Sequence, residues 1–417
     1  MRVLWVTNIP PASASRLLGE PPSPFGGWVQ GSLEGIARNG RVQVTVASPG
    51  EGAVRLLGTD GGADYVSFTP IGRRAAGVRG RDVAAQVIDI CRPDLVHLHG
   101  TELPHSASFA AVAGGRGIPT VVSVQGLVSF YARHLTAFLP PTVVHGVGTR
   151  PWVRSDRVVG MQQAFVAQGR LEQETLRAVG HVIGRTTWDR TCVGQLNPSL
   201  RYHHCDETLR PTFYGARWQA EDARPHTIFV SQGHYPVKGL HLLLQALPAV
   251  LNRFPDTVVT VAGQSPVAAG RRSPYSRHLL GLLTKLEIAD HVLFVGPRDE
   301  SQMLQHYLSS SLVACPSVIE NSPNSVAEAM LLGMPVVAAH VGGVPDMVFN
   351  GVNGLTYQAD APYILAHAIT TVFDDPAAAG AMGDRARERA FVRHDPERNA
   401  RRTLDIYTGI IGEGTSR

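Results

Sequence analysis

Two glutamates, Glu320 and Glu328, stand eight positions apart in the run E-N-S-P-N-S-V-A-E. A carboxylate can accept hydrogen bonds from two neighbouring hydroxyl groups at once, so each side chain suits the adjacent hydroxyls of a sugar. The spacing would let one carboxylate hold a ribose and the other a hexose, with a pyrophosphate between them. An isolated pair of this kind is more often a surface-loop glutamate followed by a helix glutamate, so the surrounding sequence has to decide.

Lys238 is one of only two lysines among 38 basic residues, the other being Lys285. It stands in S-Q-G-H-Y-P-V-K-G, after a predicted strand and at the head of a predicted helix. A lysine is unfavourable near the positive end of a helix dipole unless an anion is present. An ammonium beside helix-terminal N–H groups binds phosphate well. We therefore predict a phosphate contact for Lys238; an exposed first-turn lysine is the alternative.

Two glycine pairs follow predicted strands and would let the backbone approach a ligand closely. They are Gly26-Gly27, in the first half of the chain, and Gly342-Gly343, in the second. Glycine in such loops can also serve only to relieve a turn. We expect close approach to a phosphate or sugar at both pairs.

The elements around the two glutamates predict an anion site. A strand ends at Cys315, Ser322 has the type of a helix N-cap, and Pro323 suits the first helical position. The helix then contains Glu328 and ends at Gly333. Unpaired N–H groups and the helix dipole both favour an anion at a helix start that follows a strand end.

Short β-branched runs alternate with helix-length segments along the whole chain, which indicates parallel sheets covered on both faces. The predicted strands are Arg2–Asn8, Val42–Ala47, Asp94–His99, Pro119–Val124, His181–Gly184, Thr227–Ser231, Thr257–Ala262, Val292–Val295, Leu312–Cys315 and Pro335–Ala338. Two such series predict an α/β protein with two Rossmann-like, doubly wound domains facing across a cleft. The boundaries we predict are 1–220 and 221–395, followed by a C-terminal helix at 396–417 that either packs back on the first domain or is a solvated surface.

Several enzyme classes are excluded by missing motifs. The chain has no G-x-G-x-x-G, no P-loop, no H-E-x-x-H and no G-x-S-x-G. It also lacks D-x-D, which disfavours chemistry that holds a nucleotide through a metal on paired carboxylates. Its four cysteines lie far apart with no C-x-x-C, so neither a disulfide nor a zinc site is expected.

The net charge of the chain is small, but it is unevenly distributed between the two halves. Residues 1–220 carry a net charge of +7 and residues 221–417 a net charge of −3, in a chain of net charge +4. A basic first half suits an anionic membrane or a phosphate-bearing partner, and a scattered solvated surface is the alternative. No apolar stretch is long enough for a signal peptide or a membrane span, so we expect a cytoplasmic protein, with peripheral contact at the inner face of the membrane left open.

Three motifs in the second half of the chain together resemble a known protein family. The run from Glu320 to Ala338 resembles the donor-site signature of retaining glycosyltransferases of GT-B fold, family 4. Gly342–Asp346 resembles the family's G-G-x-P-E with Asp in place of Glu, and Asn350–Gly354 resembles its turn before a late strand. The first half is similar more loosely, through Gly26-Gly27 and Asp94–Gly100.

The resemblance implies a role for each matching residue. Glu328 would hold the ribose hydroxyls, Lys238 the pyrophosphate and Glu320 the donor sugar. The further donor-binding positions that it implies are Gly26, Gly27, Asn321, Ser322, Asn324 and Ser325. Such enzymes use a nucleoside diphosphate sugar, here of UDP or GDP type, with no metal ion or other cofactor. They transfer the sugar with retention, and the leaving phosphate takes the proton of the acceptor.

Two positions depart from the family pattern. The family usually has an arginine five residues before the lysine, where this chain has Gly233. It also tends to have a histidine after the strand ending at Val124, where this chain has Gln125, which can hydrogen-bond a sugar or acceptor hydroxyl but cannot act as a general base. Arg185 either supplies the missing phosphate charge or is a structural partner near the cleft.

The resulting expectation is a retaining, metal-independent glycosyltransferase with a hydroxyl acceptor, either a lipid-linked glycan or a small molecule, and no nucleic-acid partner. Two alternatives stay open. One is a sugar-nucleotide hydrolase or epimerase of the same fold, and the other is a non-catalytic binding partner of an assembly complex, because the arginine and the histidine are both lost.

Overall fold

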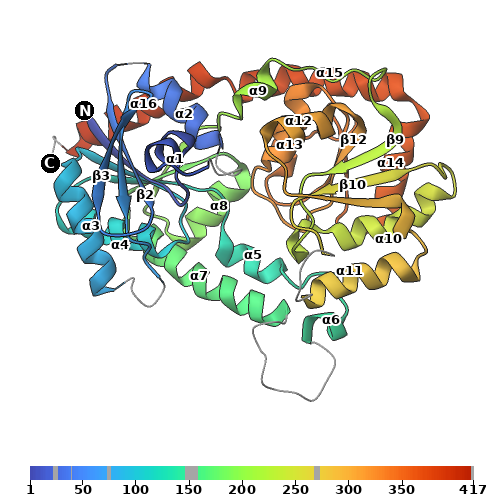
Figure 1. Ribbon diagram of the computed structural model, residues 1–417, viewed down its shortest axis with the longest axis horizontal. Helices are drawn as coiled ribbons and strands as arrows, with labels where there is room; N and C mark the ends of the chain where they lie inside the picture. The colour runs from blue at the N-terminus through green and yellow to red at the C-terminus, as the bar shows by residue number, and fades with distance from the viewer. Residues whose placement is uncertain (22–26, 39, 73–76, 146–157, 267–272, 415–417) are drawn as a thin grey trace. The chain divides into compact units, whose positions relative to one another are not determined.

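The computed structural model describes residues 1–21, 27–38, 40–72, 77–145, 158–266 and 273–414, and Figure 1 shows its ribbon. The chain divides into two compact units. Unit 1 contains Met1–Phe130, Val166–Arg210 and Arg393–Arg417, and unit 2 contains Tyr131–Phe165 and Pro211–Val392. Three of the four divisions fall inside the helices α5 (Val128–His134), α7 (Val158–Ala178) and α15 (Pro376–Arg393), and the fourth falls between Arg210 and Pro211. Residues 131–165 therefore group with unit 2, although the sequence placed them within a first domain of 220 residues.

Unit 1 is built on a sheet of eight strands in the order β3-β4-β2-β1-β5-β6-β7-β8. Its strands are β1 (Arg2–Val6), β2 (Gln43–Pro49), β3 (Arg55–Asp60), β4 (Ala63–Phe68), β5 (Leu95–His99), β6 (Thr120–Ser123), β7 (His181–Gly184) and β8 (Arg201–His204). All pairs are parallel except β3 with β4. The carboxyl ends of the parallel strands therefore lie at one edge, where a doubly wound sheet binds ligands.

Helices cover both faces of this sheet. They are α1 (Ala12–Leu18), α2 (Gly27–Ala37), α3 (Val78–Cys91), α4 (Pro104–Gly115), α8 (Thr187–Leu196) and α16 (Pro396–Gly414). Successive side chains of β1 alternate between two cores, since Leu4 packs with residues of α3, α4 and α8, and Trp5 with residues of α2 and α16. Helix α16 lies beside α2 in Figure 1 and packs on it.

Unit 2 is built on a sheet of six strands in the order β11-β10-β9-β12-β13-β14, with every pair parallel. Its strands are β9 (Arg224–Val230), β10 (Val258–Ala262), β11 (Val292–Gly296), β12 (Ser310–Cys315), β13 (Val336–Ala339) and β14 (Leu355–Tyr357). Its further helices are α6 (Pro141–His145), α9 (Pro211–Tyr214), α10 (Leu240–Leu251), α11 (Pro274–Lys285), α12 (Glu300–Leu308), α13 (Asn324–Leu332) and α14 (Pro362–Asp374), with 3₁₀ turns at Pro236–Lys238, Ala289–His291 and Val344–Asp346. On β9, Ile228 and Val230 face the core formed with α10, α11 and α14, while Phe229 packs on Tyr307 of α12.

The ten strands predicted from β-branched runs are all present, with ends shifted by a few residues. The prediction missed β3 and β4, which form a hairpin around Gly61-Gly62, two glycines with positive φ angles of 60° and 81°. It also missed β8, an edge strand of sequence RYHH whose side chains are only partly buried. That strand carries no apolar alternation because none of its four side chains is fully buried on either face of the sheet.

Candidate functional site

The loops after β9 and β12 bring Lys238 and Glu320 together in unit 2. These two strands are neighbours in the parallel sheet, so their carboxyl ends open on the same edge. The Nζ atom of Lys238 lies 2.6 Å from Oε1 of Glu320, and the Ser317 hydroxyl donates to the same oxygen at 2.7 Å. Glu320 is buried, and the lysine side chain keeps 20% of its surface exposed. An ammonium and a carboxylate thus share one half-open site at the ligand-binding edge.

Glycines allow the loops of this site to pack directly on one another. Gly239, with φ of +66°, lies so close to the loop after β12 that a Cβ atom there would be 1.7 Å from the carbonyl oxygen of Pro316. Gly342, with φ of +52°, would place a Cβ atom 1.9 Å from the carbonyl oxygen of Glu320, and Gly343 donates its N–H to that oxygen at 3.0 Å. Gly342-Gly343 thus approaches the backbone that carries Glu320, where we had expected approach to a ligand.

The charge of Lys238 is strongly stabilised by its neighbours. Burial opposes the charged form, but the Glu320 carboxylate and the Tyr235 ring outweigh it and raise the pKa of Lys238 well above its usual value. Tyr131 of α5 is hydrogen-bonded to the backbone of Asn321, and burial, then Glu320, raises the pKa of this phenol well above its usual value. Lys238 therefore carries its charge throughout the physiological pH range.

Glu328 is held by a tyrosine that the sequence did not single out. This carboxylate is buried in α13, and the hydroxyl of Tyr307 lies 3.1 Å from its Oε2 and 3.2 Å from the carbonyl oxygen of Ser325. Tyr307 itself is fully buried between Phe213 and Phe229. The carboxylate is therefore fixed in orientation before any ligand arrives. No local pattern in the sequence pointed to this contact across 21 residues.

The start of α13 differs from the prediction by one residue. The helix begins at Asn324 with Pro323 in the N-cap position, and it ends, as predicted, at Gly333 in the left-handed conformation. Ser322 is not the N-cap, because its hydroxyl donates to the sulfur of Met347 at 3.6 Å. The first turn, which includes Ser325, accordingly has no side-chain cap. Such a helix start, next to the buried Asn321, retains the capacity to bind an anion.

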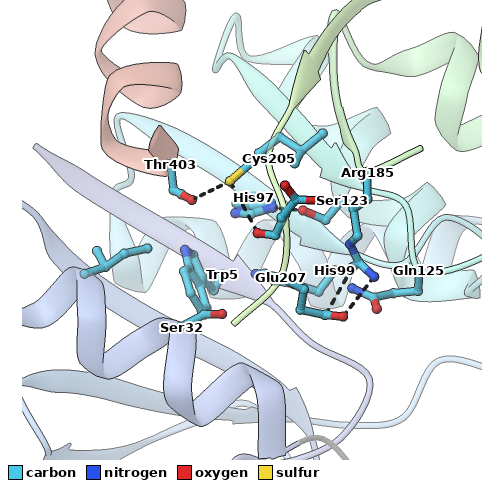
Figure 2. A pocket seen from close by; sticks show the side chains of 13 residues that line it. Trp5, Ser32, His97, His99, Ser123, Gln125, Arg185, Cys205, Glu207 and Thr403 are labelled. Carbon is cyan, nitrogen blue, oxygen red and sulfur yellow. Dashed lines mark hydrogen bonds and ion pairs between the residues drawn. The ribbon is translucent and has the colours of Figure 1, made fainter. Parts of the chain in front are cut away.

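Gln125 and Arg185 lie in unit 1, where they line a cavity of about 50 Å³ (Figure 2). Arg185 makes a double contact with Glu207, at 2.9 Å from Nη1 to Oε2 and 3.1 Å from Nη2 to Oε1, and both side chains are buried. Of the two roles open for Arg185, this geometry supports the structural partner, because its charge is already neutralised. In contrast, Nε2 of Gln125 is buried without a partner in the described part of the chain. The cavity therefore offers a neutral hydrogen-bond donor.

Two histidines in β5 line the same cavity and were missed, although H-L-H places them on one face of a strand. The Trp5 indole donates to the Tyr407 hydroxyl at 2.9 Å, and that hydroxyl lies 2.5 Å from Nδ1 of His97. The other ring nitrogen of His97 lies 2.7 Å from the hydroxyl of Ser123. Burial lowers the pKa of His97 to about 3, and burial, then His97, lowers that of His99 well below its usual value. Both rings are therefore neutral.

A second missed group, Glu172 of α7, organises the start of α5. Its carboxylate is fully buried and accepts hydrogen bonds from the N–H groups of Val128 and Ser129, at 2.8 and 3.1 Å, and from the hydroxyls of Ser129 and Thr101. Burial raises the pKa of Glu172 to about 7, against the lowering effect of these donors, and Glu102 adds to the rise. This group fixes the chain that follows Gln125.

The remaining predicted positions are less informative. Gly27 is the first residue of α2, and Gly26 lies outside the described residues. Gly233, which stands where the family has an arginine, is buried, and a Cβ atom there would lie 2.7 Å from Cδ2 of Leu240 and 3.1 Å from Cγ1 of Val261. The core of unit 2 therefore fills the place that a side chain would need.

The described residues contain neither a metal-ligand cluster nor a membrane-spanning helix. They contain no group of three or more His, Cys, Asp or Glu side chains placed to hold a metal ion. Nor do they contain a helix with the length and apolar character needed to cross a bilayer.

Residues 216–389, which carry Lys238, Glu320 and Glu328, match the model of the family described as glycosyl transferases group 1. This stretch of the chain is therefore similar to the group 1 glycosyltransferases. The chain is 29% identical over 266 residues to the D-inositol 3-phosphate glycosyltransferase of Streptomyces avermitilis, an alignment that covers 61% of this chain and 55% of that protein. The chain thus spans little more than half the length of this relative.

Solved structures are similar to the chain in fold over both units. Sucrose-phosphate synthase from Thermosynechococcus elongatus superposes with a TM-score of 0.73 at 16% identity, over 99% of this chain and all of that one. HepE from Anabaena, solved in complex with UDP and glucose, has a TM-score of 0.69 at 20% identity, over 98% and 99% of the two chains. The predicted GT-B fold, with two Rossmann-like sheets, is confirmed.

Proposed function

We propose that this chain is a retaining glycosyltransferase that moves a sugar from a nucleoside diphosphate sugar to an acceptor hydroxyl without a metal ion. The observation that carries the proposal is the placement of Lys238, Glu320 and the start of α13 at the ligand-binding edge of the group 1 domain. The HepE complex with UDP and glucose supports a donor of this type.

In this proposal each group of unit 2 has one task. Lys238 and the first N–H groups of α13 hold the diphosphate and stabilise the charge that grows on it as it leaves. The second oxygen of Glu320 accepts from hydroxyls of the donor sugar, while Lys238 and Ser317 fix the first oxygen. Glu328, oriented by Tyr307, accepts from the ribose hydroxyls. These contacts position the donor, so catalysis rests on orientation and charge.

The transfer itself needs no general base from unit 1. The acceptor oxygen forms a bond to the anomeric carbon on the face from which the diphosphate departs, as the bond between that carbon and the phosphate oxygen breaks. The departing phosphate oxygen takes the acceptor's proton. Gln125, whose Nε2 is unpaired in the described structure, would donate a hydrogen bond to the acceptor. The acceptor classes we propose are a lipid-linked glycan and a small hydroxylated molecule. The relative from Streptomyces avermitilis, named a D-inositol 3-phosphate glycosyltransferase, supports the second class.

Turnover with a panel of nucleotide sugars and acceptors tests the proposal. We expect nucleotide release that depends on an added hydroxyl acceptor and that falls at least a hundredfold in Lys238→Ala. The matched control is Lys285→Ala, since Lys285 is the only other lysine and is exposed on α11. Release that is independent of acceptor would instead indicate a sugar-nucleotide hydrolase. The absence of nucleotide binding by saturation-transfer NMR would exclude both enzymes.

A further inference from the structure

The donor site of unit 2 lacks a charge to meet its ligand. The ammonium of Lys238 is already balanced by Glu320 at 2.6 Å, so the pair presents no net charge. A nucleoside diphosphate sugar brings a negative charge on each of its two phosphates. Entry of this anion into a half-buried site costs free energy unless another cation meets it. The start of α13 offers N–H groups and its dipole to this anion, but the Lys238–Glu320 pair adds no net positive charge.

Two positions that could supply an arginine beside Lys238 do not do so. Gly233 has no room for a side chain, because Leu240 and Val261 occupy the space beside it. Arg298 follows β11, which is separated from β9 by β10, so at about 4.8 Å per strand it starts roughly 10 Å from the Lys238 loop. Arg298 is placed to meet a more distant part of the nucleotide.

A histidine stands beside Lys238 with an unused nitrogen. His234 belongs to the same loop after β9, its ring packs on Tyr235 at 4.6 Å between centroids, and the ammonium of Lys238 lies 5.8 Å from the centre of that tyrosine ring. Its Nδ1 atom is buried and has no hydrogen-bond partner in the described structure. An imidazole with a free nitrogen is a base that can become a cation and a donor when an anion arrives.

We propose that His234 is a further donor-site residue that takes up a proton when the diphosphate binds and supplies the second positive charge beside Lys238. The proposal rests on the function proposed above and deepens it. Donor binding is then coupled to pH through one side chain, and the site gains its charge only when it is occupied.

The surroundings of His234 agree with this switch. Burial, then the charge of Lys238, lowers the pKa of His234 below its ordinary value, so the ring is neutral in the free protein. The other ionisable groups around Lys238 are Tyr235 on the same loop, Cys315 at the end of β12, Glu320 after β12 and Tyr131 on α5, and Lys238 keeps its charge. A diphosphate adds negative charge and raises the pKa of His234, so binding becomes tighter as the pH falls from 8 to 6.

Isothermal titration calorimetry in two buffers of different ionisation enthalpy measures the proton taken up. The probes are UDP-glucose, GDP-mannose and ADP-glucose, whose phosphate diesters do not titrate near neutral pH, so any uptake belongs to the protein. For the sugar that binds, we expect uptake of roughly half a proton at pH 7. The variant His234→Gln should lose the uptake and bind three- to tenfold more weakly. The variant His234→Arg should keep the affinity but lose its pH dependence.

The matched control is His278→Gln. His278 of α11 is also a partly buried histidine with a lowered pKa and a buried ring nitrogen without a partner in the described structure. Its replacement should leave the proton uptake unchanged. Binding without uptake, uptake that persists in His234→Gln, or uptake that His278→Gln also removes would overturn the role of His234 and leave the proposed function intact. If none of the three nucleotide sugars binds, both proposals fall.

Discussion

At the scale of single residues, the contacts of a side chain indicate its role better than its position in the sequence does. Glu320 and Glu328 were both candidates, but only the structure shows that Lys238 and Ser317 share one oxygen of Glu320 and that Tyr307 orients Glu328. Arg185 was open to two roles, and its double contact with Glu207 supports the structural one. Partners distant in sequence carry no local signal, so these contacts could not be predicted from one sequence.

The first prediction concerns Glu328. The variant Glu328→Gln keeps the size of the side chain but removes the charge that would accept two ribose hydroxyls, so donor affinity should fall by about 2 kcal/mol, roughly thirtyfold. The control is Glu388→Gln on α15, where the glutamate is exposed. Titration calorimetry with a nucleotide sugar measures both variants. Equal affinities for Glu328→Gln and the unmodified chain would remove Glu328 from the donor site.

At the scale of elements, strands with apolar runs were predictable and the loops that carry the site were predictable only in part. The Lys238 loop and the helix after Glu320 were expected at the right ends of two strands, and they are there. The polar edge strand β8 was missed because period-two patterning needs a buried face. The N-cap at Pro323 was missed because Ser322 is a good cap by type, and its contact with Met347 is tertiary.

The second prediction concerns the contact between two of these loops. In Gly342→Ala, the new methyl group would collide with the carbonyl oxygen of Glu320, and the positive φ adds strain, so the free energy of unfolding should fall by at least about 2 kcal/mol. Gly281→Ala is the control, since a Cβ atom at that position meets nothing within 4 Å. Urea denaturation of the two variants gives the comparison. If Gly342→Ala were as stable as Gly281→Ala, the loops could not pack as described.

The third prediction concerns Glu172, which holds the first turn of α5. Burial raises its pKa in the folded state to about 7, above the ordinary value of 4.5, so the folded protein binds more protons than the unfolded chain between these values. The contribution of Glu172 to stability is therefore largest below pH 4.5 and is lost as the pH rises to 7, by about 3 kcal/mol.

Replacing this carboxyl with an amide removes that dependence on pH. Between pH 4.5 and pH 7, Glu172→Gln should gain about 3 kcal/mol in free energy of unfolding relative to the unmodified chain, as measured by urea denaturation at several pH values. Glu174→Gln, two positions along the same helix, is the control because its side chain is exposed. Parallel pH profiles for Glu172→Gln and the unmodified chain would contradict the assignment.

At the scale of the whole molecule, the alternation of β-branched runs and helices was enough to predict two doubly wound sheets. Few other folds bury strands that alternate with helices in this way. The path of the chain between the units was not predictable in the same way. Nothing in the composition of residues 131–165 indicated that they would group with unit 2. Tyr131, which lies against Lys238 and Glu320, belongs to this segment.

The most direct test of the central claim is a crystal structure of the chain with a nucleoside diphosphate sugar bound. The account predicts that Nζ of Lys238 lies within hydrogen-bonding distance of a phosphate oxygen, that Glu328 accepts from the ribose, and that Glu320 accepts from the sugar. A nucleotide bound at another edge of unit 2, or one whose phosphates contact neither Lys238 nor the start of α13, would contradict it.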